Sequence, residues 1–96
     1  MISLKDLHDA VLDKIEFDWK EGSLSFSLKV GSPAAARVQI IADQVSHFNC
    51  PREYPWGESA SINAIGSKQD TGATVLIIEM QSGDTLEIKC GAFSIK

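Results

Sequence analysis

The sequence is poor in the patterns that mark several specialised classes of protein. It has no run of about 18 consecutive apolar residues, so no membrane-spanning helix is predicted. Its first ten residues, MISLKDLHDA, lack the charged start and apolar stretch of a secretory signal. It has only two cysteines, Cys50 and Cys90, which are expected to stay reduced in a chain without an export signal. We therefore expect a cytoplasmic protein without a disulfide.

Positive charge is also scarce. Nine Lys and Arg residues stand against thirteen Asp and Glu residues, which gives a net charge of −4 with no block of like charge. Affinity for nucleic acid comes largely from Lys and Arg side chains that displace phosphate counterions. The composition therefore argues against a nucleic-acid partner.

Catalytic and metal-binding signatures are missing as well. There is no glycine-rich phosphate loop, nucleophile elbow or zinc-protease motif. His47 and Cys50 are spaced like two ligands on a turn, but zinc sites need three or four ligands and the chain has no second paired motif. His8 and Asp9 are adjacent, and adjacent helical residues do not face each other, so a structural hydrogen bond is the favoured role for His8. We expect a protein that is not an enzyme and has no metal or cofactor.

What the sequence does contain is enough apolar material for one core. With 96 residues, 44% of them hydrophobic and 23% charged, it has the size and composition of a globular domain. No linker or internal repeat divides it. Residues 1–96 are therefore expected to form a single domain.

Hydrophobic periodicity predicts a short helix and then strands. Ser3 and Asp6 are spaced like a capping box, and the apolar residues that follow recur at helical spacing, which predicts a helix over residues 4–10. Alternation then predicts a hairpin whose strands meet at Glu21-Gly22. A two-residue turn there would place Trp19 opposite Leu24.

Four further strands are predicted, over residues 37–45, 59–65, 73–81 and 85–95. For the last two, a loop of three or five residues keeps apolar side chains on one face and pairs Met80 with Leu86. That register sends Val75 and Ile77 to the opposite face, where the helix or a second subunit would have to cover them. The predicted fold class is α+β, mostly β: a short N-terminal helix followed by a six-stranded antiparallel curled sheet, as a half-barrel or a small sandwich.

The least ordinary stretch is the irregular loop NCPREYPWG with the residues that follow it. Tyr and Trp are enriched at binding hot spots because they bring large contact area at little entropic cost. The alternative is a structural plug at the open end of the sheet. The candidate partner-binding residues are Arg52, Glu53, Tyr54, Trp56 and Glu58.

Four segments carry a resemblance to known proteins: Leu7-His8-Asp9-Ala10, the strand with Trp19 before a glycine turn, PREYPWG and QSGD. Together they resemble a small bacterial family of uncharacterised proteins. In size and acidic character the chain is also similar to the immunity proteins that neutralise bacterial toxins, although no motif is shared.

Three functions are compatible with these features. The first is a non-enzymatic protein-binding domain, in its most concrete form an acidic immunity-type inhibitor of a basic toxin. The second is a small-ligand-binding domain whose concave sheet face is lined by Phe17, Trp19 and Phe26 and closed by Trp56. The third is a structural homodimer subunit that associates through Val75 and Ile77.

Overall fold

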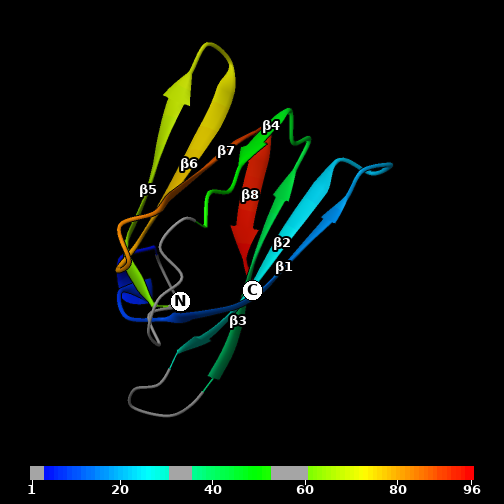
Figure 1. Ribbon diagram of the computed structural model, residues 1–96. Coiled ribbons are helices and arrows are strands. Elements are labelled where there is room, and N and C mark those ends of the chain that lie inside the picture. The colour runs from blue at the N-terminus through cyan, green and yellow to red at the C-terminus, as the bar shows by residue number, and fades with distance from the viewer. Residues whose placement is uncertain (1–3, 31–35, 53–60) are drawn as a thin grey trace.

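The computed structural model describes residues 4–30, 36–52 and 61–96 (Figure 1). Within them the chain forms one four-residue 3₁₀ turn and eight β-strands. In chain order these are η1 (Leu4–Leu7), β1 (Val11–Asp18), β2 (Ser23–Val30), β3 (Ala36–Asp43), β4 (His47–Asn49), β5 (Ile62–Asp70), β6 (Ala73–Met80), β7 (Thr85–Cys90) and β8 (Ala92–Ile95).

The strands form two four-stranded antiparallel sheets. The first has the order β1-β2-β3-β8, and the second has the order β4-β7-β6-β5. One hydrophobic cluster is shared by the two sheets, because every second residue of the central strands points toward it. Its largest fully buried side chains are Phe26, Leu7, Leu24, Leu28, Ile40, Ile62, Leu76, Ile78, Ile88 and Cys90.

Two bent strand pairs connect the sheets. The chain leaves the first sheet after β3, bends at Gln44, and enters the second as β4; it returns from β7 to β8 through Gly91. Gln44 has a φ of 56°, in the left-handed region. The Gly91 amide donates to the Asp43 carbonyl at 2.9 Å, and the Ser46 amide donates to the Lys89 carbonyl at 2.8 Å. Pairing thus continues on both sides of the bend.

The predicted N-terminal helix is wrong. Leu4–Leu7 is a single 3₁₀ turn, and no α-helix occurs in the described ranges. Asp9 has a φ of 69°, its amide donates to the Ile62 carbonyl at 2.8 Å, and the Ile62 amide donates to the Ala10 carbonyl at 2.8 Å. A helix this short forms too few bonds of its own, so pairing with another segment prevails. Leu7 is nevertheless fully buried, so this segment packs on the core without forming an α-helix.

The single six-stranded sheet is also wrong, because the chain bends from one sheet into another. β4 follows β3 after three residues and β8 follows β7 after one, and each joins a different sheet from the strand before it. β5 runs on to Asp70, five residues beyond the predicted end of this strand at residue 65. A bulge between Ile62 and Ala64 shifts its register, so Ile65 instead of Ala64 faces Ile78.

The last hairpin confirms the odd-numbered loop but not its predicted pairs. Five residues separate Glu79 from Thr85, so Ile78 faces Leu86, where Met80 was expected. Val75 lies on the other face and is 4% exposed, between Lys68 of β5 and Lys89 of β7 in register. The aliphatic stems of two flanking lysines are suited to cover it.

Candidate protein-binding surface

The loop that holds the candidate partner-binding residues is largely beyond what the structure describes. Arg52 is described and exposed. Glu53, Tyr54, Trp56 and Glu58 lie outside the described residues. The assignment of this loop to recognition or to plugging the sheet therefore stays a prediction.

A different aromatic site stands at the tip of the β1–β2 hairpin. The hairpin itself is confirmed, but its turn has four residues where two were predicted, and Phe17 faces Leu24. Asp18 explains the longer turn: its carboxylate accepts from the Glu21 amide at 3.0 Å, and its carbonyl accepts from the Gly22 amide at 2.8 Å. Gly22 closes the turn at a φ of 67°, which glycine adopts without strain. The two-residue slip removes Trp19 from the sheet.

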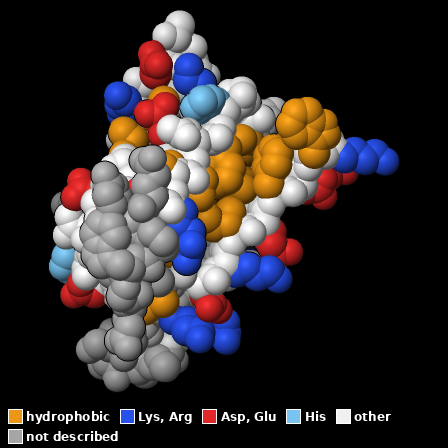
Figure 2. All heavy atoms as spheres, viewed as in Figure 1, with side chains coloured by type: hydrophobic (Ala, Val, Ile, Leu, Met, Phe, Trp, Pro, Cys, Tyr) orange, Lys and Arg blue, Asp and Glu red, His pale blue; other side chains and the backbone are white. Residues whose placement is uncertain are grey.

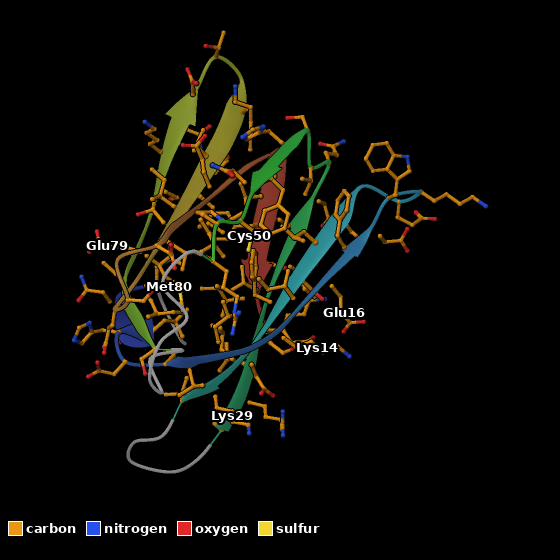
Figure 3. The ribbon with its side chains drawn as sticks, in the orientation of Figure 1. Lys14, Glu16, Lys29, Cys50, Glu79 and Met80 are labelled. Carbon is orange, nitrogen blue, oxygen red and sulfur yellow. The ribbon has the colours of Figure 1, made fainter. Side chains whose placement is uncertain are left out.

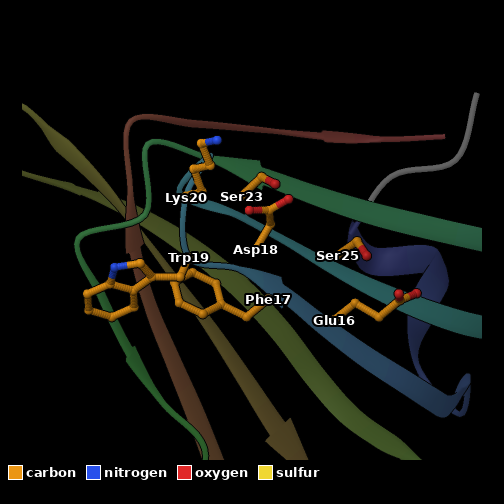
Figure 4. A pocket seen from close by; sticks show the side chains of 7 residues that line it. All are labelled: Glu16, Phe17, Asp18, Trp19, Lys20, Ser23 and Ser25. Atoms are coloured by element: carbon orange, nitrogen blue, oxygen red, sulfur yellow. The ribbon is translucent and has the colours of Figure 1, made fainter.

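Trp19 is consequently 86% exposed, the most open of the described large hydrophobic side chains. Its ring packs edge-to-face on Phe17, with centroids 6.1 Å apart at an angle of 88°. Phe17 is itself 43% exposed. Figure 4 shows the two rings together at the end of β1. The turn thus leaves the Trp19 ring in water, in contact with the partly exposed ring of Phe17 on β1.

An apolar groove lies beside these rings, and we call it the aromatic groove. It has a volume of about 460 Å³. The far wall is formed by the β3–β4 connection and β4, and it is fixed to the hairpin because the Val45 amide donates to the Gly22 carbonyl at 2.9 Å. Figure 2 shows hydrophobic side chains gathered on this part of the surface. The lining residues are Phe17, Trp19, Gly22, Val45, Ser46, His47 and Phe48.

The groove is anchored to the core through Phe48. This half-buried ring lies edge-to-face against the fully buried Phe26, with centroids 6.1 Å apart at 77°. Because Phe26 is packed, the predicted concave pocket lined by Phe17, Trp19 and Phe26 does not form as such. What forms is an open groove whose inner wall is rigid and whose outer wall is the exposed tip of the hairpin.

The opposite side of the same hairpin is polar. A second hollow of about 590 Å³ is lined by Glu16, Asp18, Lys20, Ser23 and Ser25 together with the two aromatic residues. Charged and hydroxyl side chains therefore border the exposed rings (Figure 4). An apolar centre with a polar rim is the usual composition of a protein-binding patch.

The residues considered for catalysis or metal binding are not assembled into such a site. The His47 ring lies 3.9 Å from a Glu87 carboxylate oxygen, and both side chains are more than half exposed. No group of three or more His, Cys, Asp or Glu side chains converges within residues 4–30, 36–52 and 61–96. Nor does any helix of the described ranges have the length and apolar character needed to cross a membrane.

Both cysteines are free thiols with perturbed acidity. Burial raises the pKa of the Cys90 thiol, and the negative charge of Asp43 raises it further. Partial burial likewise raises the pKa of Cys50, with a smaller effect from Asp84, although Cys50 as a whole is exposed. A nucleophilic cysteine needs a lowered pKa, so neither environment favours thiolate chemistry.

His8 has the structural role that was predicted for it, although not on a helix. Its Nδ1 lies 2.5 Å from the Asn63 carbonyl oxygen, and its Nε2 lies 3.5 Å from an Asp9 carboxylate oxygen. Gln81 Nε2 donates to the same Asp9 oxygen at 2.5 Å. Asn63 Nδ2 donates to Glu79 at 2.6 Å. The bonds of His8 and Asp9 tie the N-terminal segment to β5 and to the turn after β6, and the bond from Asn63 to Glu79 joins β5 to β6.

Comparison with known proteins adds a fold but no activity. No protein-family model matches the chain, and no curated protein is similar to it in sequence. A solved structure described as an uncharacterized protein from Neisseria gonorrhoeae superposes with a TM-score of 0.68 at 14% identity. The match covers 93% of this chain and 91% of that one. This neighbour is consistent with the resemblance of the sequence to uncharacterised proteins, and at this identity the likeness concerns the fold alone.

Proposed function

We propose that this chain is a non-enzymatic protein-binding domain that recognises its partner through the aromatic groove. The observation that carries the proposal is the exposure of Trp19, which at 86% is held outside the sheet by the Asp18–Gly22 turn. Full burial of a large apolar side chain contributes about 1.5–3 kcal/mol, and the fold forfeits most of this at Trp19 and part of it at Phe17. A partner that covers them would recover that free energy.

The geometry of the groove supports a protein partner. Trp is the residue most enriched at interface hot spots, particularly next to a pocket that excludes water when it is occupied. Here Trp19 borders a groove of about 460 Å³ whose inner wall is fixed by the packed rings of Phe48 and Phe26. A preformed wall lowers the entropic cost of binding.

The finer form of the proposal is an acidic immunity-type inhibitor of a bacterial toxin, acting in the cytoplasm. The net charge of −4 supports a basic partner, because opposite charge speeds the encounter of two proteins. A small-ligand role has weaker support, since both hollows beside Trp19 are open to the surface and small-molecule sites enclose most of their ligand.

The test is affinity capture followed by a binding measurement with the purified partner. Three baits are compared: wild type, Trp19→Ser, and Val11→Ser as the control. Val11 is an exposed apolar residue of β1, the strand that precedes Trp19, at 39% exposure, but it does not line the groove. Circular dichroism first verifies that all three are folded. A fourth bait with Arg52→Ala and Trp56→Ala tests the predicted loop separately.

The expected result is a protein retained by wild type and by Val11→Ser and lost from Trp19→Ser. Isothermal titration calorimetry with that protein should then show about 30-fold weaker binding for Trp19→Ser, which corresponds to about 2 kcal/mol. Equal affinity of wild type and a folded Trp19→Ser variant would refute the groove as the binding site.

A further inference from the structure

The outer edge of β1 has little backbone pairing within residues 4–30, 36–52 and 61–96. β1 is the first strand of its sheet and pairs with β2 along one side. Along its other side, the described part of the chain offers one partner, a bridge from Val11 to Ser61. Residues 12–18 continue beyond this bridge for about 20 Å of strand at the usual rise per residue. Their outward backbone groups would serve an added strand.

Two features of this edge discourage an arbitrary strand. A bulge interrupts the register between Leu12 and Lys14, and charged side chains occupy the strand. Asp13 in the bulge lies 3.4 Å from Arg37 of β3, so its charge is directed toward its own sheet. Bulges and charges are the usual means by which proteins keep edge strands from pairing at random.

The remaining charges nevertheless complement one particular strand, which is β1 of a second copy running antiparallel to the first. Lys14 and Glu16 flank Ile15 on the same face and form an ion pair of 3.4 Å. Figure 3 shows both side chains on the outer side of β1. In an antiparallel pair centred on Ile15, Lys14 of one copy lies opposite Glu16 of the other, and the reverse holds by symmetry. Two opposite-charge cross-strand pairs result, and such pairs stabilise a sheet.

The inner face of β1 fits the same arrangement. Ile15 is half-buried and would face its own copy across the two-fold axis. Phe17 would face the bulge of the second copy, where the half-buried Leu12 lies on the core side opposite Leu28. An exposed Phe17 would thus gain an apolar neighbour.

We propose that β1 pairs with β1 of a second copy of this chain about a two-fold axis at Ile15. The β1-β2-β3-β8 sheets of the two copies then form one eight-stranded antiparallel sheet. This isologous interface differs from the homodimer expected from Val75 and Ile77, because Val75 is covered within its own subunit. It shares Phe17 with the aromatic groove, but Trp19, on which the proposed partner site depends, lies beyond the end of β1. Trp19→Ser therefore tests the partner site and the variants at Lys14 and Glu16 test the strand pairing, so the two proposals fail or succeed separately.

A charge-exchange series tests the pairing by sedimentation equilibrium, at protein concentrations from about 1 μM to about 1 mM. Glu16→Lys alone would place lysine opposite lysine twice in each dimer. Lys14→Glu combined with Glu16→Lys restores both opposite-charge pairs with the positions exchanged. Lys29→Glu, on the exposed part of β2, is the control for a change of charge away from this edge.

We expect wild type and Lys29→Glu to dimerise with similar dissociation constants. Glu16→Lys should raise that constant about tenfold or more, and the double variant should return it close to the wild-type value. Trp19→Ser should leave it unchanged. An Ile15→Cys variant in a Cys50→Ser background should cross-link to itself under mild oxidation, because facing Cβ atoms in a strand pair are close enough for a small adjustment to bridge them.

Two results would overturn the proposal. One is a wild-type protein that remains monomeric over the whole concentration range. The other is a folded double variant that dissociates as readily as Glu16→Lys alone, since the pairing depends on the match between the two charges and not on either residue by itself.

Discussion

Replacing Gly91 with alanine should destabilise the protein through a single side chain, Gln44. A Cβ built on Gly91 would collide with Oε1 of Gln44 and lie 3.0 Å from both Cβ and Cδ of that residue. Real Cβ atoms essentially never approach a heavy atom more closely than 3.0 Å. The Gln44 amide can rotate away, but its Cβ is fixed by the backbone bend between β3 and β4. Besides that rotation, the backbone at the bend must give by a few tenths of an ångström.

Overpacking of this kind costs about 1–3 kcal/mol. For a domain of this size, 1 kcal/mol lowers the melting temperature by about 4–8 °C, so Gly91→Ala should lower it by about 10 °C. The assays are thermal and urea unfolding followed by circular dichroism.

A double-mutant cycle identifies the cause. Gln44→Gly removes the obstructing side chain and suits a φ of 56°, so on its own it should change stability little. In that background Gly91→Ala should cost less than about 0.5 kcal/mol, which gives a coupling energy of about 1–2 kcal/mol. If Gly91→Ala costs the same in both backgrounds, the collision with Gln44 is not the reason that this position is glycine.

Three further outcomes follow from the structure. Phe26→Ala, which removes a fully buried ring and the support of Phe48, should lower the free energy of unfolding by about 3–5 kcal/mol in urea titrations, and a loss below about 1 kcal/mol would contradict the packing described. Asp9→Gly should change the free energy of unfolding by less than about 1 kcal/mol, because glycine adopts the positive φ without strain and this gain offsets the lost hydrogen bond from Gln81. A loss above about 2 kcal/mol would mean that the hydrogen bond is the larger of the two effects. Because burial raises the pKa of Cys90, the unfolded chain releases this proton first, so stability should fall as the pH rises beyond the ordinary thiol value of 9.0. Cys90→Ala should flatten that decline, and an unchanged slope in denaturation at pH 8–10.5 would assign it to other groups.

The alternating strands could be predicted because each carries its pattern locally. β2 and β3 lie where the alternation of Leu24, Phe26 and Leu28 and of Val38, Ile40 and Ala42 placed them, with these residues buried. The preference of the last hairpin for an odd-numbered loop also follows from pattern alone, because an even loop would mix the faces.

The bends and slips could not be predicted in the same way. A bulge of one residue at Asn63 or Asp13 reverses the face of everything beyond it, and no composition marks either position. The requirement for glycine at position 91 comes from the Gln44 side chain that lies against it, and this contact cannot be inferred from the sequence. Nothing in the sequence of residues 8–10 indicated that Asp9 and Ala10 would form backbone hydrogen bonds with Ile62, more than fifty positions away.

The exposed Trp19 had a signal that was available in the sequence. Asp18 four residues before Gly22 is a composition typical of a four-residue hairpin loop with a side-chain acceptor at its start. A slip of two residues preserves the buried face, so the hydrophobic pattern alone cannot choose between the two turns. The choice decides whether Trp19 is part of the core or stands in solvent.

The two bent strand pairs also bear on how the molecule comes apart. Because β3 continues into β4 and β7 continues into β8, melting either sheet pulls on strands that the other sheet holds. Neither sheet can open fully as a separate unit, so unfolding should proceed in one cooperative step. The amides of Gly91 and Ser46, which form hydrogen bonds at the bends, should therefore exchange slowly with solvent. Among the described strands, the freest motion is left to the tips of the β1–β2 and β5–β6 hairpins, which project from the two joined sheets (Figure 1).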